Sequence, residues 1–211
     1  MKLYTYFRSS AAFRVRIALN LKGVDYDSVA VHLPNDEHRG AEFLAVNPEA
    51  TIPVLDDGGT LLWQSLAIVE YLDARFPEPR LVPAEPVARA RVQALAQLVA
   101  CDVHPLNNLR VLRYLRGELG QDERAVRRWY AHWIAEGFRA LETYVARWSG
   151  GPHCYGDAVS LADICLVPQV YNARRFDCDL EPYPTLVRIA DGLAALPAFA
   201  SAAPERQPDA E

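Results

Sequence analysis

The stretch that decides the fold is Tyr4–Gly23, which reads YTYFRSSAAFRVRIALNLKG and changes periodicity at a pair of serines. The residues before the serines are aromatic and β-favouring, which predicts a buried strand. After the serines, apolar residues recur at helical spacing until Gly23, a residue typical of helix ends. The predicted local order is therefore strand, Ser9-Ser10, helix.

The two serines have a structural explanation and a functional one. Either Ser9 or Ser10 can accept a hydrogen bond from a helix amide and so cap the helix. The remaining amides and the helix dipole also favour a negatively charged group at this end. The residues alone leave open both the role of this helix start and the choice of serine.

The following residues continue a small α/β pattern. Helices are predicted over 41–46 and 66–76, and Ser65 stands at the start of the second one. A cis Ile52-Pro53 bond would leave the Ile52 backbone facing outward as a hydrogen-bonding edge. Strands are predicted over 25–33, 51–55 and 60–63, of which the last two form an antiparallel hairpin around the Asp-Asp-Gly-Gly turn at 56–59.

The second half of the chain is predicted to be helical. Prolines crowd residues 77–86 and predict a linker, which gives an α/β domain over 1–80 and an all-helical domain over 88–211. Ser160 to Asp163 precedes an apolar run and predicts a capping box with a folding role. Helices are expected over 88–119 with a kink at Pro105, over 125–148 with an end at Gly150, and over 184–195, and residues 204–211 are expected to fray.

Composition excludes several classes of function. The net charge of −5 over 211 residues argues against a nucleic-acid partner. No segment approaches the roughly 20 apolar residues of a membrane span, and the N-terminus lacks the pattern of a signal peptide, so we expect a cytoplasmic protein. The four cysteines show no metal-ligand spacing, which predicts neither a metal site nor a disulfide framework.

The series of motifs resembles that of glutathione transferases over nearly the whole chain. Ser9-Ser10, Ile52-Pro53, Gln64-Ser65 and Ser160 to Asp163 follow in the same order. Four segments look like the zeta class of that family: YFRSSAAFRVRIALNLKG, QSLAIVEYL, HPLNNLRVL and LADICLVPQVYNARRF. The resemblance implies a thioredoxin-like N-terminal domain, an all-α C-terminal domain, a homodimer and glutathione as cofactor.

The resemblance also implies a reaction, the glutathione-dependent cis–trans isomerisation of a maleyl keto acid, a dicarboxylate of tyrosine breakdown or alternatively of gentisate breakdown. A free thiol with a pKa near about 8.5 is only a few per cent ionised at neutral pH. A hydroxyl donor contributes on the order of 1.5 to 3 kcal/mol and a helix N-terminus about 0.3 to 1, which is enough to supply the thiolate. The alternatives are a general conjugating transferase and a protein of this fold kept for structure or partner binding.

The resemblance assigns roles to individual residues. The donor to the thiolate falls on Ser9, with Ser10 and the Ala11 amide as neighbours, although many zeta members have a cysteine where this chain has Ala11. Without that cysteine, mechanisms that join enzyme and glutathione in a mixed disulfide are disfavoured. Glutathione contacts are assigned to His38, Ile52, Gln64, Ser65, His104 and Asn108, and substrate carboxylates to Arg8, Arg110 and Arg175.

Two of these assignments involve a choice. On sequence alone, His38 is an exposed loop histidine. Arg174 and Arg175 are adjacent and point in different directions on a helix, and Arg175 is chosen because Arg-Phe is the part that matches the family. Arginine suits the task because its planar guanidinium pairs with carboxylates bidentately.

Overall fold

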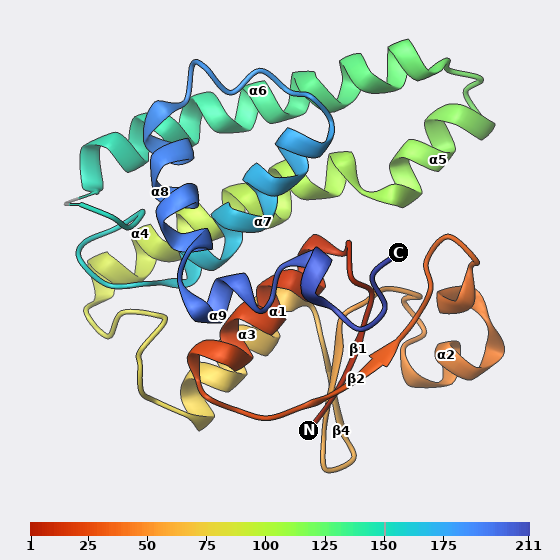
Figure 1. The fold of residues 1–211 in the computed structure, drawn as a ribbon, viewed down its shortest axis with the longest axis horizontal. Helices are drawn as coiled ribbons and strands as arrows, with labels where there is room; N and C mark the ends of the chain where they lie inside the picture. The colour runs from red at the N-terminus through yellow and green to blue at the C-terminus, as the bar shows by residue number, and fades with distance from the viewer. Residues whose placement is uncertain (150) are drawn as a thin grey trace. The chain divides into compact units, whose positions relative to one another are not determined.

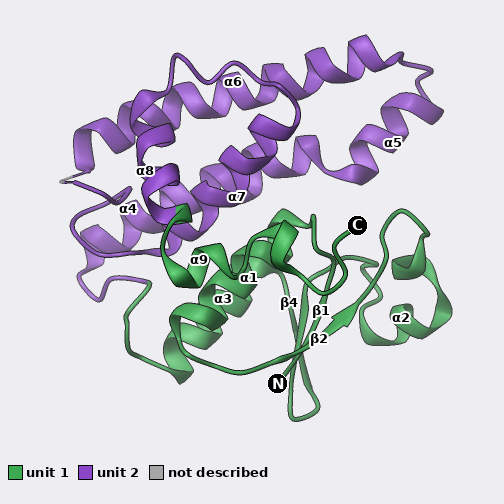
Figure 2. Ribbon diagram, viewed as in Figure 1, with its two compact units in different colours: residues 1–81, 194–211 green, residues 82–193 purple. Residues whose placement is uncertain are grey.

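The computed structural model describes residues 1–149 and 151–211 and divides into two compact units (Figure 2). Unit 1 contains residues 1–81 and 194–211, and unit 2 contains residues 82–193. The expected division at 80/88 placed residues 194–211 in the helical part, whereas they pack with unit 1. The predicted helix end at Gly150 lies outside the described residues. None of the helices in the described ranges is both long and apolar enough to span a bilayer.

Unit 1 is built on a four-stranded sheet of β1 (Lys2–Thr5), β2 (Asp27–Ala30), β3 (Val54–Asp57) and β4 (Thr60–Trp63), in the order β2-β1-β3-β4 (Figure 1). The sequence prediction of strand, serine pair and helix is confirmed, because Ser9 and Ser10 stand between β1 and the body of α1 (Ser10–Leu21). Helix α1 connects β1 to the parallel strand β2. The predicted hairpin is also confirmed. Its first strand begins at Val54 and not at Thr51, its second strand has the predicted bounds, and its turn is Gly58-Gly59, both at positive φ.

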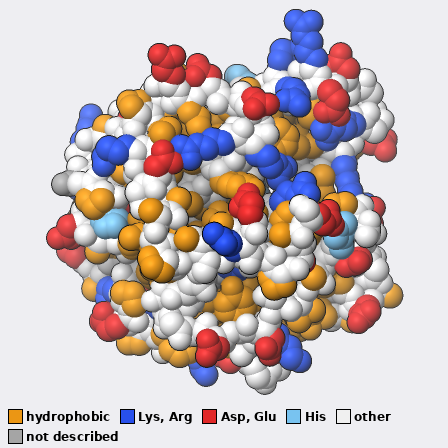
Figure 3. Space-filling view, viewed as in Figure 1, with side chains coloured by type: hydrophobic (Ala, Val, Ile, Leu, Met, Phe, Trp, Pro, Cys, Tyr) orange, Lys and Arg blue, Asp and Glu red, His pale blue; other side chains and the backbone are white. Residues whose placement is uncertain are grey.

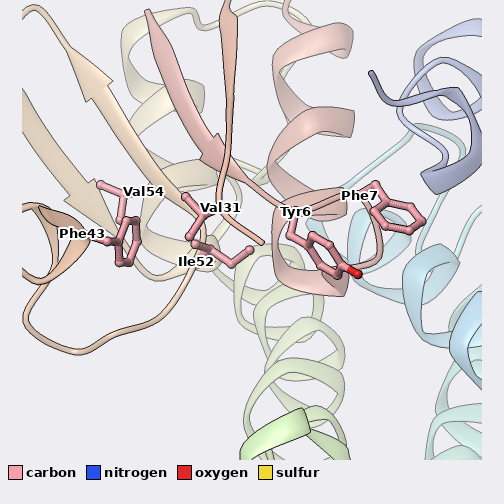
Figure 4. Close-up of a cluster of buried hydrophobic side chains, with 6 residues drawn as sticks. All are labelled: Tyr6, Phe7, Val31, Phe43, Ile52 and Val54. Carbon is pink, nitrogen blue, oxygen red and sulfur yellow. The ribbon is translucent and has the colours of Figure 1, made fainter. Parts of the chain in front are cut away.

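Helices cover both faces of this sheet. Leu3 lies opposite Leu55 in the register, and both are fully buried on one face. Figure 1 shows α1 and α3 (Ser65–Arg75) on one side of the sheet and α2 (Ala41–Val46) on the other. On the α2 side, the Phe43 ring lies 6.0 Å from the Tyr4 ring and beside Val54 (Figure 4). Each such buried side chain contributes about 1.5 to 3 kcal/mol, and the result is the predicted thioredoxin-like arrangement.

The segment 194–211 is ordered against unit 1, so the expectation that residues 204–211 fray is wrong. It contains α9 (Pro197–Ala200) and a 3₁₀ turn (Pro204–Arg206). Ala202 and Gln207 are buried. The physical reason is hydrogen bonding to the rest of the unit, because Arg16 Nε donates to the Ala202 carbonyl at 3.0 Å and the Phe7 amide donates to Asp209 Oδ2 at 2.9 Å.

Unit 2 is helical and is organised around α7 (Leu161–Arg175). This helix is buried on nearly every face, as expected of a helix that is apolar all round. The predicted capping box at its start is confirmed, since the Ser160 side chain and the Asp163 carboxylate complete it reciprocally. The other long helices are α4 (Pro86–Gln97), α5 (Leu109–Gly117), α6 (Glu123–Trp148) and α8 (Pro184–Ala194).

The single kinked helix predicted over 88–119 is instead interrupted. After α4 the chain forms a π-helix (Leu98–Val103) and a 3₁₀ helix (His104–Asn107), and α5 starts after Asn108. Pro105 lies in the first turn of the 3₁₀ helix, where a missing amide is tolerated, so it marks a break between helices. The π-helix lies against α6 so closely that a Cβ at Gly137 would come within 2.1 Å of Val103 Cγ2.

Candidate active site

The start of α1 distinguishes the two serines that the sequence left open. Ser9 is the N-cap, and its Oγ accepts a hydrogen bond from the Ala12 amide at 3.2 Å. Ser10 is the first helical residue and is buried, whereas Ser9 and Ala11 are half-buried. The cap bond uses an oxygen lone pair and leaves the hydroxyl proton of Ser9 to donate elsewhere. Because the first turn of α1 contains no acidic residue, no carboxylate of the helix itself offsets the positive end of its dipole.

The start of α3 is a second helix N-terminus in unit 1 without an acidic residue in its first turn. Its N-cap is Gln64, which adopts a φ of 67°, and its side-chain amide donates to both Glu49 carboxylate oxygens at 3.0 Å. Ser65 is buried, and its Oγ accepts from Arg14 Nη1 at 3.3 Å. Arg14 itself lies on α1 and is buried. The Arg14 contact thus ties the serine at the start of α3 to the helix that Ser9 caps.

Two further predicted residues lie in unit 1. The Ile52-Pro53 bond is cis, and Ile52 precedes β3 by two residues, so its backbone lies outside the paired register of the sheet. The Ile52 side chain belongs to the buried cluster drawn in Figure 4. The interpretation of His38 as an exposed loop residue is wrong. The left-handed turn at Asp36 (φ 59°) leads into a 3₁₀ helix (Glu37–Arg39) that buries the His38 side chain, whose Nε2 lies 3.9 Å from Asp36 Oδ1.

Arg8 lies directly before Ser9 in a tight turn. The Ser9 amide donates to the Tyr6 carbonyl at 2.9 Å, which leaves Phe7 and Arg8 as the central turn residues. The guanidinium of Arg8 lies 4.6 Å from the Phe7 ring, and its Nη2 lies 3.7 Å from a Glu211 carboxylate oxygen. The Arg8 side chain is 41% exposed and therefore accessible to a ligand.

Sequence reasoning missed Arg16, the buried residue that donates hydrogen bonds to the carbonyls of this turn. Arg16 is fully buried, and its guanidinium donates to Thr5 Oγ1 at 3.0 Å, to the Tyr6 carbonyl at 3.4 Å and to the Phe7 carbonyl at 2.9 Å. Burial lowers the pKa of Arg16 to about 10, so it still carries its charge at neutral pH. The available signal was the position of Arg16 within the otherwise apolar run of α1, where a charged residue requires buried partners.

In unit 2, the predicted residues gather at the helix break and at the end of α7. His104 opens the 3₁₀ helix and is half-buried. Asn108 caps α5 by accepting from the Arg110 amide at 3.1 Å, and the Arg110 side chain is exposed. The asparagine before an amphipathic run was a local signal from which this helix start could have been predicted.

An aromatic stack connects the helix break with Arg175. Asn107 Nδ2 donates to the Tyr130 carbonyl at 3.3 Å, and the Tyr130 ring stacks on Phe176 with centroids 3.7 Å apart. The Arg175 guanidinium lies 4.9 Å from the Phe176 ring. Burial raises the pKa of Tyr130, so the phenol is neutral at physiological pH. Arg174, by contrast, forms a bidentate pair with Asp191 at 2.7 and 3.1 Å.

On the face drawn in Figure 3, acidic and basic side chains are interspersed. Within the described ranges, no cluster of histidine, cysteine and acidic residues could hold a metal ion. The four cysteines form no disulfide with one another, and Cys101 is exposed.

Comparison with known proteins places the chain in a family. Residues 1–74 match the N-terminal domain of glutathione S-transferases. A probable maleylacetoacetate isomerase of Vibrio cholerae is 56% identical over 99% of this chain and 97% of its own length. A solved holo structure of maleylpyruvate isomerase, described as a bacterial zeta-class glutathione S-transferase, superposes with a TM-score of 0.98 at 48% identity over the whole of both chains. The chain belongs to the zeta class of glutathione transferases.

A further similar structure contains ligands. The structure of a maleylacetoacetate isomerase from Methylobacterium extorquens AM1, with bound malonate and glutathione, matches with a TM-score of 0.93 at 43% identity over the whole of both chains. The predicted fold class and family are therefore confirmed. Of the predicted site residues, eight lie in unit 1 (Arg8, Ser9, Ser10, Ala11, His38, Ile52, Gln64 and Ser65) and four in unit 2 (His104, Asn108, Arg110 and Arg175).

Proposed function

We propose that this chain is a maleylacetoacetate isomerase, a glutathione-dependent enzyme that converts maleylacetoacetate to fumarylacetoacetate in tyrosine and phenylalanine breakdown. The observation that carries the proposal is the geometry of Ser9, which caps α1 through its oxygen and keeps its hydroxyl proton for a ligand. The names of similar proteins support the same activity. Glutathione, when bound, supplies a thiolate that adds reversibly to the conjugated double bond and so allows rotation.

In this proposal Ser9 stabilises the thiolate, with Ser10 and the Ala11 amide beside it. A hydroxyl donor to a charged acceptor contributes about 1.5 to 3 kcal/mol, which lowers the thiol pKa by one to two units. The uncompensated N-terminus of α1 acts in the same direction. Because Ser10 is buried, Ser9 is the serine hydroxyl that a ligand can reach at this helix start.

The remaining contacts of unit 1 fit the parts of a γ-glutamyl tripeptide. We assign the γ-glutamyl carboxylate to Gln64, Ser65 and the first amides of α3, where the dipole favours an anion. The Ile52 backbone would pair with the cysteinyl residue in the manner of an added strand, since it lies outside the sheet register. His38 is assigned to the glycyl carboxylate. In unit 2, His104 and Asn108 are assigned to glutathione as well.

Three arginines are assigned to the substrate carboxylates, namely Arg8, Arg110 and Arg175. All three are exposed. Arg175 lies on an aromatic ring and Arg174 lies in an ion pair, which supports Arg175 as the ligand-binding member of the two. The proposed domain roles follow, with glutathione held by the thioredoxin-like part and the carboxylates held largely by the helical part.

Replacement of Arg175 tests the assignment of the carboxylate. We expect Arg175→Ala to raise the KM for the dicarboxylate by about 10- to 100-fold, the value of a hydrogen-bonded charge pair, while kcat changes little. Arg174→Ala is the matched control, because it removes only an exposed ion pair worth about 0 to 1 kcal/mol of stability. Equal KM values for the two variants would contradict the assignment.

The alternative substrate is maleylpyruvate, of gentisate breakdown, because the zeta-class structure with a TM-score of 0.98 is named for that substrate. Conjugation of glutathione to general electrophiles is the alternative reaction. The deciding experiment follows the absorbance of each maleyl keto acid with purified protein, with and without glutathione. Glutathione-dependent turnover of maleylacetoacetate, faster than that of maleylpyruvate, is expected. Turnover of neither, together with formation of stable conjugates, would overturn the proposal.

We also propose that the enzyme acts in the cytoplasm as a homodimer. The exposed free thiol of Cys101 agrees with a reducing compartment, where disulfides are rare. The dimer is inferred from the family resemblance, and sedimentation velocity of the purified chain tests it.

A further inference from the structure

The C-terminal segment of unit 1 contacts the turn that precedes Ser9. In a turn closed between residues i and i+3, the amide of residue i+1 has no partner within the turn. Here that residue is Phe7, because the Ser9 amide donates to the Tyr6 carbonyl. The Phe7 amide instead donates to Asp209 Oδ2 at 2.9 Å, across 202 residues of sequence. A carboxylate acceptor makes this a charge-assisted hydrogen bond, roughly twice as strong as a neutral one.

The carbonyl of the same residue, in the next peptide group, is held by Arg16. Its Nη2 donates to the Phe7 carbonyl at 2.9 Å, and its Nε donates to the Ala202 carbonyl at 3.0 Å. The buried guanidinium therefore connects the turn to the segment from which Asp209 projects. Phe7 is held by a buried positive charge at its carbonyl and by a negative charge at its amide.

Asp209 projects from a segment that is itself fixed. Gln207 Nε2 donates to the carbonyls of Ser201 and Ala203, both at 2.9 Å. Asn20 of α1 donates through Nδ2 to the Ala198 carbonyl at 2.9 Å. The carboxylate is consequently presented to Phe7 from an ordered base, and its position does not depend on the Asp209 side chain alone.

We propose that Asp209 is a positioning residue, which fixes the Tyr6–Ser9 turn from the C-terminal segment and so keeps the Ser9 hydroxyl in place for the glutathione thiolate. This inference rests on the proposed function, because it assumes the assigned role of Ser9. Phe7 lies two residues before Ser9 and within the same hydrogen-bonded turn, so a displaced Phe7 peptide displaces Ser9. A shift of about 1 Å at a reacting group can cost on the order of 100-fold in rate.

The test compares Asp209→Ala and Asp209→Asn in the full chain. The alanine variant leaves the Phe7 amide without its acceptor, and we expect kcat to fall about 10- to 100-fold, with the KM for glutathione within about threefold of wild type. The asparagine variant keeps a neutral oxygen acceptor and should recover kcat to within about threefold of wild type. Asp25→Asn is the matched control, since it removes an exposed carboxylate elsewhere in unit 1 and should leave kcat unchanged.

A second readout separates positioning from folding and from the proposed function. Titration of the ultraviolet absorbance of enzyme-bound glutathione gives the thiolate pKa without any isomerase substrate. We expect this pKa to rise in Asp209→Ala and to stay near the wild-type value in Asp209→Asn and Asp25→Asn. If wild type shows no isomerisation, the proposed function fails, while the thiolate titration still decides the role of Asp209.

The inference would be overturned by wild-type kcat and thiolate pKa in folded Asp209→Ala. It would equally be overturned if the activity of that variant fell only in proportion to its folded fraction, with an unchanged thiolate pKa. Should Asp209→Ala not fold, Asp209→Glu keeps the charge and moves the acceptor by one methylene. A lowered kcat with a raised thiolate pKa is then expected, and wild-type values of both would contradict the proposal.

Discussion

Ser9 and Ser160 are both N-caps, one at the start of α1 and the other at the start of α7, yet their surroundings differ. Ser160 is 4% exposed, and its hydroxyl donates to Asp163 Oδ2 at 2.8 Å. Ser9 is half-buried, accepts from Ala12 and has no acidic residue in the first turn of its helix. Both hydroxyl functions of Ser160 are used within the capping box, whereas the cap at Ser9 uses only the oxygen. The same residue type is therefore structural in one unit and available for chemistry in the other.

Replacement of Asp163 tests whether the cap at Ser160 serves the stability of the fold, and it has the largest expected effect. It accepts hydrogen bonds from the Cys154 amide, the Ser160 amide and the Ser160 hydroxyl, each at 2.8 Å. Asp163→Ala would leave these buried donors without an acceptor, so we expect a loss of about 3 to 5 kcal/mol in the free energy of unfolding. Urea unfolding monitored by circular dichroism measures it, and a loss below about 1 kcal/mol, the usual net value of one hydrogen bond, would contradict this account.

Replacement of Ser9 tests whether its hydroxyl acts in catalysis. It should change the free energy of unfolding less than Asp163→Ala does. We expect Ser9→Ala to lower kcat about 10- to 100-fold, which corresponds to the loss of a hydrogen bond to a charged group, with little change in glutathione affinity. The lost cap should reduce the free energy of unfolding by about 0.5 to 2 kcal/mol. Steady-state kinetics measure the fall in kcat, and urea unfolding of the same variant measures the loss of stability. An unchanged kcat would remove Ser9 from the mechanism.

Ser160→Ala is the matched control for Ser9→Ala. It should cost a similar 0.5 to 2 kcal/mol or so of stability, since it removes one cap, and it should leave kcat of the folded enzyme at its wild-type value. If both variants lost activity equally, the difference between the two caps would have no functional meaning.

Local patterns in the sequence predicted the parts of the fold that depend on neighbouring residues. The serine pair before α1, the Gly58-Gly59 turn and the capping box of α7 are each specified within a few residues. The candidate site residues were chosen by family resemblance, and their roles stay predictions. The structure adds that Ser9 caps α1 while Ser10 is buried, and that Arg174 pairs with Asp191.

The features that escaped prediction depend on distant residues. The bond between Phe7 and Asp209 joins positions 202 residues apart, and no local pattern specifies such a pairing. The break in the helix before Asn108 is fixed in part by Gly137 of α6, where the absence of a side chain lets the π-helix approach. Burial of His38 follows from the turn at Asp36, a residue that adopts a positive φ without being glycine.

The return of residues 194–211 to unit 1 also sets an order for biosynthesis. Arg16 emerges early from the ribosome, but its carbonyl partner at Ala202 follows the whole of unit 2 in the chain. Residues 82–193 can assemble as a domain during translation, as domains generally do. The turn before Ser9 acquires its full set of contacts only afterwards. Nascent chains that stop short of Asp209 therefore carry every strand of the sheet but not its complete support.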